Sequence, residues 1–170
     1  MVFRGWALVK EGEREKGIVQ LRTGLAAYRA AAGELESSHW LGLLTEACWD
    51  AGQTKEGLRV LAEALGHVAR TGIVYYEPEL NRLQSELCLY RDPSQAQKAE
   101  ACARQAIEIA RGQGAKSWEL RAATSLARLW GEEGRRVEAR ELLAPIYGWF
   151  TEGFDTADLR EAAALLAELA

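Results

Sequence analysis

An internal repeat constrains this chain more than any other feature of its sequence. Each copy has the pattern of an amphipathic helix, a short polar turn and a second helix. One turn into the second helix stands a small residue, at nearly even spacing in the four copies: Gly17, Gly57, Ala99 and Ala139. A unit of roughly 40 residues is typical of stacked helical pairs, because one pair alone cannot bury its apolar face.

The columns of the repeat follow helical periodicity. Four residues beyond the small residue stand Leu21, Leu61, Ala103 and Leu143, and three further on stand Gly24, Ala64, Ala106 and Ile146. Steps of three and four predict one buried stripe on each second helix. The first helices carry a column of mostly small residues, Gly5, Thr45, Leu87 and Ala127, and one of mostly large residues, Leu8, Cys48, Tyr90 and Trp130. We expect both columns to pack between helices.

These patterns predict an all-α chain of about four helical pairs and a C-terminal capping helix. The expected helices are 2–11, 13–32, 37–51, 54–71, 75–90, 94–112, 115–131, 135–152 and 156–169. Gly12, Gly52 and Gly134 mark equivalent turns, and Ser94 with Gln97 predicts a capping box after Asp92-Pro93. Pro145 predicts a kink in the eighth helix. The last helix, capped by Asp155 or Thr156, should bury Leu159, Leu165, Leu166 and Leu169.

Composition excludes several classes of protein. Apolar residues make up 48% of the 170 residues and the formal net charge is −4, so a packed core is expected and a basic nucleic-acid-binding stripe is absent. No apolar run reaches the length of a membrane span, and the N-terminus lacks the pattern of a signal peptide. We therefore expect a cytoplasmic protein in which Cys48, Cys88 and Cys102 are small buried thiols.

The small-residue columns with neighbouring aromatics resemble those of tetratricopeptide (TPR) repeats, although no copy keeps the full family signature. The resemblance implies a right-handed superhelix. Residues 75–89, 99–130 and 134–169, above all LLAPIYGWFTEGFDTADL, resemble the C-terminal repeat region of bacterial signalling proteins with AAA-type ATPase and class III adenylate or guanylate cyclase domains. This resemblance implies one repeat domain over 1–170 that is part of a longer regulatory protein. The short first helix, which reads like the end of a repeat, also indicates a fragment.

No residue pattern indicates catalysis. The segment GQGAKS (112–117) lacks the spacing of a phosphate loop and follows a helix, so we interpret it as a turn between helices. His39 and His67 have no ligand spacing around them, and no nucleophile elbow is present. We therefore expect no enzyme activity, no cofactor and no metal.

The first helix of each pair should line the concave face of a superhelix, where partners bind. The predicted groove residues are His39, Glu46, Trp49, Asn81, Gln84, Arg121, Thr124 and Arg128. Arg121 and Arg128 share one helix face and suit a carboxylate-bearing peptide, although an ordinary solvated helix face is the simpler interpretation. Trp149, Phe150 and Phe154 either bury the capping helix or form an apolar patch for a partner.

Three hypotheses for function remain at this point. The first is a regulatory region that binds a protein partner, or another domain of its own polypeptide, and controls an ATPase or cyclase. The second is a free-standing adaptor that binds peptides through Arg121 and Arg128. The third is self-association through an apolar end left by an incomplete first repeat.

Overall fold

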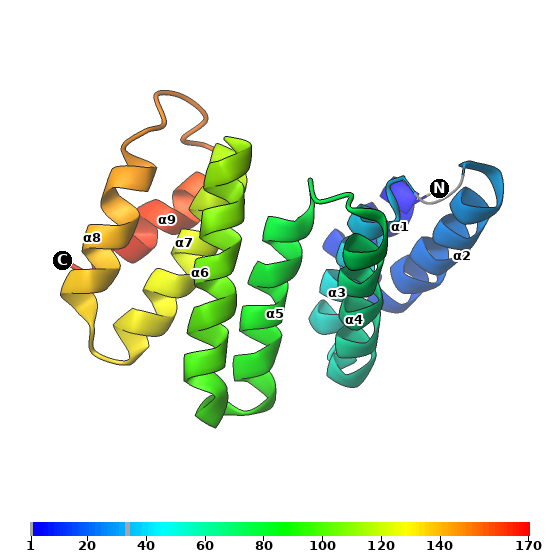
Figure 1. Cartoon of the computed structure of the whole chain (residues 1–170), viewed down its shortest axis with the longest axis horizontal. Helices are drawn as coiled ribbons and strands as arrows, with labels where there is room; N and C mark the ends of the chain where they lie inside the picture. Colours follow the sequence, from blue (N-terminus) through cyan, green and yellow to red (C-terminus); the bar gives the residue numbers. More distant parts are fainter. Residues whose placement is uncertain (1, 33–34) are drawn as a thin grey trace. The chain divides into compact units, whose positions relative to one another are not determined.

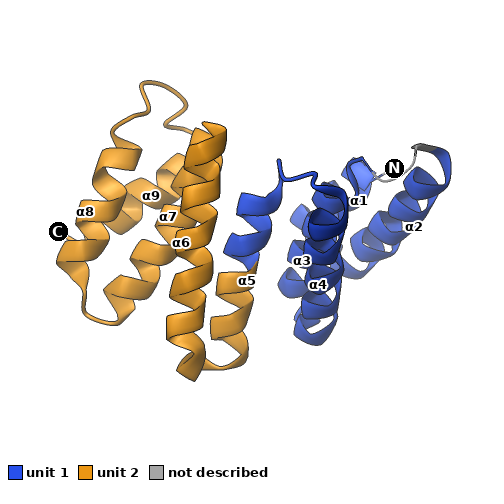
Figure 2. Ribbon diagram, viewed as in Figure 1, with its two compact units in different colours: residues 1–83 blue, residues 84–170 orange. Residues whose placement is uncertain are grey.

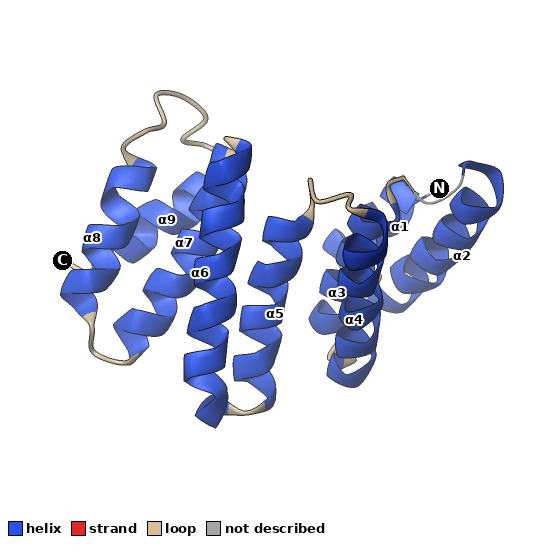
Figure 3. Ribbon diagram, in the orientation of Figure 1, coloured by secondary structure: helices blue, strands red, loops and turns tan. Residues whose placement is uncertain are grey.

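The computed structural model describes residues 2–32 and 35–170, and every regular element in this part of the chain is a helix (Figure 3). Figure 1 shows the nine α-helices of the described residues in chain order. They are α1 (Val2–Lys10), α2 (Arg14–Ala32), α3 (Ser37–Asp50), α4 (Thr54–Thr71), α5 (Glu77–Arg91), α6 (Ala96–Gln113), α7 (Lys116–Glu132), α8 (Arg136–Tyr147) and α9 (Ala157–Glu168). The predicted all-α fold is confirmed, and most helix ends agree with the expected ones to within two residues.

The chain divides into two compact units, residues 1–83 and 84–170, with the boundary inside α5 (Figure 2). In unit 1, α1 packs against α2 and α3 packs against α4, and both α1 and α2 contact α3. In unit 2, α7 packs against α6 and α8, and α9 packs against α7 and α8. These are sequential helical hairpins. The single domain and the superhelix inferred from the sequence stay predictions.

The predicted stripes form the cores of both units. Leu21, Leu61, Ala103 and Leu143 are at most 2% exposed. The turn glycines have the left-handed backbone that the repeat pattern requires, with φ of +93° at Gly12, +73° at Gly52 and +81° at Gly134. The capping helix also forms as expected: Leu159, Leu165 and Leu169 are buried, and Leu166 packs partly against the core of unit 2.

Two local predictions about helix ends are wrong. The helix α8 ends at Tyr147, two residues after Pro145, and not near residue 152; the amides of Trp149 and Phe150 instead donate to carbonyls three residues earlier. The capping box at Ser94 does not form, because the Asp92 side chain accepts from the Ser94 amide and starts a short 3-10 helix.

Some side chains are more exposed than the sequence predicted. Tyr90 is 63% exposed and so does not belong to the core column of the first helices. Cys48 is buried as expected, whereas Cys88 and Cys102 are only half-buried. At the start of α9, Thr156 occupies the N-cap position, but its side chain makes no capping hydrogen bond. None of the described helices is long and apolar enough to cross a membrane.

Candidate protein-binding surfaces

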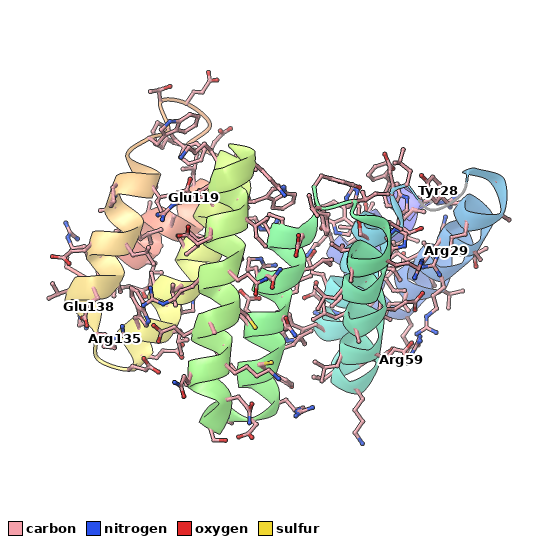
Figure 4. The ribbon with its side chains drawn as sticks, viewed as in Figure 1. Tyr28, Arg29, Arg59, Glu119, Arg135 and Glu138 are labelled. Atoms are coloured by element: carbon pink, nitrogen blue, oxygen red, sulfur yellow. The ribbon has the colours of Figure 1, made fainter. Side chains whose placement is uncertain are left out.

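Six aromatic side chains of unit 1 gather beside the first turn of α3. They come from α1, α2, α3 and the segment that enters α5, and we call them the aromatic cluster: Phe3, Tyr28, His39, Trp40, Tyr75 and Tyr76. Figure 4 labels Tyr28 on α2. These side chains come from three successive repeats, so only the packing of neighbouring repeats brings them together.

His39 lies at the centre of the cluster. Its ring stacks on Trp40 at a centroid distance of 4.6 Å and an interplanar angle of 16°, and it lies 4.6 Å from the ring of Tyr76. Phe3 meets Trp40 edge to face at 4.9 Å. Tyr76 can approach α3 this closely because Gly42 has no side chain: a Cβ there would lie 2.3 Å from a ring carbon of Tyr76.

The cluster has a buried base and an exposed rim. Trp40 and Tyr76 are 6% and 4% exposed, whereas Phe3 is 65% and Tyr75 is 42% exposed. The exposed aromatics rest on buried ones, which limits the rotamers available to them. Rigid, amphipathic aromatic side chains of this kind are enriched where proteins bind partners.

The cluster is uncharged near neutral pH. Burial lowers the pKa of His39, although the nearby Glu36 carboxylate opposes this shift. Burial also raises the pKa of Tyr75 to about 12, with smaller contributions in the same direction from Glu36 and Tyr28. Because the imidazole of His39 and the phenol of Tyr75 are both neutral, they favour contact with a partner segment of apolar or uncharged polar residues.

The other residues predicted from the sequence in unit 1 lie apart from this cluster. The Glu46 carboxylate accepts from Lys10 at 2.9 Å, and Trp49 is half-buried. Asn81 is 3% exposed, and its amide donates to the Glu77 carbonyl of the same helix at 2.9 Å. The prediction, from helical periodicity, that the Asn81 side chain faces solvent is therefore wrong.

In unit 2 the predicted residues on α7 differ in accessibility. Thr124 is 4% exposed and its hydroxyl donates to the Leu120 carbonyl, so it faces the helix backbone and not a partner. Arg128 forms an ion pair with Glu161 of α9, whereas the Arg121 guanidinium lies 5.6 Å from the ring centroid of Trp118. Gln84, at the start of this unit, is half-buried.

The question left open for the aromatics after α8 has a mixed answer. Phe150 packs partly against the core of unit 2, whereas Trp149 is 58% and Phe154 is 48% exposed. The ammonium of Lys116 lies 5.7 Å from the Trp149 ring, and the same ammonium donates to the buried carboxylate of Glu119 at 2.7 Å. The Lys116 ammonium therefore lies beside the exposed ring of Trp149 and is already paired with a carboxylate. Figure 4 labels Glu119.

Sequence reasoning found His39 but missed its partners in the cluster. The available signals were the adjacent pair Tyr75-Tyr76 just before α5 and the glycine at 42, which a helix interior does not favour. Among the described residues, no group of three or more His, Cys, Asp or Glu is placed to hold a metal ion. The segment GQGAKS spans the turn between α6 and α7, as predicted, with Gly114 left-handed at φ +66°.

No family model matches this chain, and no curated protein matches its sequence. Solved structures do match. One is the crystal structure of nearly identical TPR-like repeats from a Podosopora anserina protein that is assigned as a kinesin light chain. It superposes on this chain with a TM-score of 0.65 at 18% sequence identity, and the match covers 99% of this chain and 82% of the fungal one. A single-substitution variant of the same fungal protein gives a TM-score of 0.66 over the same shares of the two chains.

The fold is that of TPR-like helical repeats. Identity of 18% carries the fold alone, so the partner of the fungal protein says nothing about the partner of this chain. The match agrees with the sequential helical hairpins of this chain.

Proposed function

We propose that this chain is a non-catalytic protein-binding module that holds a segment of a partner polypeptide against the aromatic cluster of unit 1. The observation that carries the proposal is the exposed rim of this cluster, Phe3 and Tyr75, on the buried base of Trp40 and Tyr76. A few well-supported aromatic anchors supply most of the energy in protein interfaces. The neighbouring Leu35 and Val74 are 63% and 45% exposed and extend the apolar surface.

The cluster favours a segment with apolar side chains and little charge at its centre. His39 and Tyr75 are neutral near pH 7 for the reasons given above, so no charge of the cluster attracts or repels a partner. Glu36 is the carboxylate that acts on both groups, and it would disfavour an acidic residue at the edge of the bound segment.

The first test compares protein capture by immobilised variants of the chain. In the Phe3→Ala/Tyr75→Ala variant, recovery of the specific partner from source-cell lysate should fall at least about ten-fold, because interface anchors of this kind are worth about 2 kcal/mol or more each. The matched control is Tyr90→Ala, which removes a 63% exposed tyrosine of unit 2. Equal recovery by the double variant and the control would contradict the assignment.

We further propose that the module regulates a larger signalling protein with an ATPase or cyclase domain, in line with the resemblance of residues 99–130 and 134–169. An antibody raised against this chain, used on source-cell lysate, measures the length of the native polypeptide. A band far above 18.8 kDa supports a regulatory region. A band at 18.8 kDa leaves the free-standing adaptor as the better proposal.

The adaptor alternative places an acidic peptide on α7. It is favoured by Arg121, whose guanidinium lies over Trp118, since an arginine held over an aromatic ring is oriented for carboxylates. Arg128, on the same helix, forms an ion pair with Glu161. Under this proposal Arg121→Ala and Arg128→Ala each weaken peptide binding, and unchanged binding by both variants excludes it.

A further inference from the structure

The loop that joins α8 to α9 in unit 2 presents two large aromatic side chains to solvent. It covers residues 148–156, and Figure 1 shows it projecting beyond the end of α8. Trp149 is 58% and Phe154 is 48% exposed. A single exposed apolar side chain is ordinary on a protein surface, whereas exposed aromatics gathered on one short loop are typical of surfaces that bind a partner.

Both exposed rings rest on aromatic side chains of the core. The ring centroid of Phe154 lies 5.9 Å from that of Tyr147, and Trp149 meets Phe150 edge to face at 5.1 Å. Tyr147 and Phe150 in turn pack partly against the core of unit 2. Because Trp149 and Phe154 are already held in place, covering them with a partner would cost little side-chain entropy.

The loop is also acidic. It contains Glu152 and Asp155, both exposed, and no Lys or Arg. Across residues 2–32 and 35–170, neither carboxylate has an ion pair or a side-chain hydrogen bond. The cation beside the loop does not neutralise them, because the Lys116 ammonium near the Trp149 ring is paired with Glu119. The loop therefore has two uncompensated negative charges next to two exposed rings.

We propose that this loop is a second protein-binding surface, which takes a partner segment that alternates basic and apolar residues. Apolar side chains of the segment lie against Trp149 and Phe154, and its Lys or Arg side chains reach Glu152 and Asp155. Long basic side chains suit this surface, since their methylene stems cover aromatic rings while their charged ends stay in water.

Charge distinguishes this occupant from the others. The two carboxylates repel an acidic polypeptide, and they oppose contact with the anionic surface of a membrane. The aromatic cluster of unit 1 favours an uncharged segment, so the two surfaces differ in the chemistry of what they bind. They also share no residue, and the proposal for unit 1 and this one can therefore fail independently.

The test titrates the full, ¹⁵N-labelled chain with an acetylated and amidated hexapeptide of alternating lysine and leucine. The backbone amide signals of residues 148–156 should shift together and saturate. Two further hexapeptides separate the parts of the interaction: one of glutamate and leucine reverses the charge, and one of lysine and serine removes the apolar side chains. Both should bind at least about ten-fold more weakly, and added salt should weaken the lysine–leucine peptide.

The decisive variant is Glu152→Gln/Asp155→Asn, which should weaken binding of the lysine–leucine peptide at least about three-fold, as expected for two exposed ion pairs. Its matched control is Glu132→Gln/Glu141→Gln. This control removes two exposed carboxylates of α7 and α8 that also have no ion pair within the described part of the chain, and it should leave binding nearly unchanged.

A second pair of variants tests the rings. Trp149→Ala/Phe154→Ala should weaken binding at least about ten-fold, because aromatic anchors contribute most to interfaces of this kind. Val137→Ala is the control, since it shortens a 68% exposed apolar side chain of α8. Far-UV circular dichroism before titration shows which variants are folded. The carboxylate variant alters no packed side chain, so it tests the proposal even if the aromatic variant does not fold.

Three results would overturn the proposal. One is the absence of saturable shifts at residues 148–156 in the wild-type chain. Another is equal binding of the peptide by the Glu152→Gln/Asp155→Asn variant and its control. The last is a shift of the same loop amides when the protein is concentrated without peptide, which would assign the loop to contact with a second copy of this chain.

Discussion

Gly17 and Gly57 occupy the same position in successive repeats, yet the structure predicts opposite responses to alanine. A Cβ added to Gly17 would lie 2.6 Å from the carbonyl oxygen of Gly5 and 2.9 Å from the amide nitrogen of Val9. A Cβ added to Gly57 would lie 3.5 Å from the carbonyl oxygen of Thr45, which is an ordinary contact. The pair α1–α2 is therefore closed more tightly at this point than the pair α3–α4.

The magnitudes follow from two opposing effects. Alanine favours a helix interior over glycine by about 1 kcal/mol, so Gly57→Ala should raise the free energy of unfolding by up to about 1 kcal/mol. At Gly17 the same gain is opposed by contacts with backbone atoms, which no rotamer change can relieve. Overpacking costs about 1–3 kcal/mol, and backbone contacts belong at the upper end, so Gly17→Ala should be about 2 kcal/mol less stable than wild type.

Urea denaturation followed by far-UV circular dichroism measures both changes, with the shift of the midpoint converted through a common m value. Gly66→Ala is the matched control for helix propensity, because a Cβ there meets nothing within 4 Å. The reasoning is refuted if Gly17→Ala is as stable as the wild type. It is equally refuted if Gly57→Ala loses as much stability as Gly17→Ala.

Three further predictions concern ionisable groups. Burial alone would raise the pKa of Glu119, but hydrogen bonds from Lys116 and Arg111 outweigh this effect and lower the pKa. Glu119→Gln should therefore lower the free energy of unfolding by about 1–2 kcal/mol at pH 7, as measured by urea denaturation. This difference from wild type should disappear as the pH falls below about 4.3, the pKa of an unfolded glutamate. Burial lowers the pKa of His39, although the Glu36 carboxylate opposes this shift, so the NMR titration midpoint of His39 should lie below 6.5. The folded state should lose stability as the pH falls from neutral through this range. A midpoint at or above 6.5 would contradict the burial argument. Cys48 is 0% exposed and burial raises the pKa of its thiol, so peptide mapping after native alkylation should find it modified more slowly than Cys88 and Cys102, and equal rates would count against its burial.

Much of the fold could be predicted from local sequence because the signals for helices are local. The helix α4 begins and ends at the residues predicted for it, Thr54 and Thr71, and left-handed glycines close the turns at 12, 52 and 134. The errors at Pro145 and Ser94 arose where two local signals compete. Asp92 and Ser94 can both act as caps, and hydrogen-bond geometry decides between them.

The candidate sites could be predicted only in part. Periodicity identified His39 as a surface position of α3, but its neighbours in the cluster, Phe3 and Tyr76 among them, belong to other repeats. Asn81 and Thr124 were predicted on the same grounds, and both make hydrogen bonds to their own helices instead. Helical spacing tells which face a residue occupies, whereas its accessibility depends on the neighbouring helix.

Local sequence sets the all-α class, the presence and length of the repeat, the order of the hairpins and the buried stripes, because each follows from spacing within a single helix or turn. Packing between helices sets which glycine is sterically required and which aromatics surround His39. These properties depend on the distance between helix backbones and on the rotamers of side chains from different repeats. Leu25 of α2, Leu41 of α3 and Val60 of α4 meet only after the helical pairs have packed.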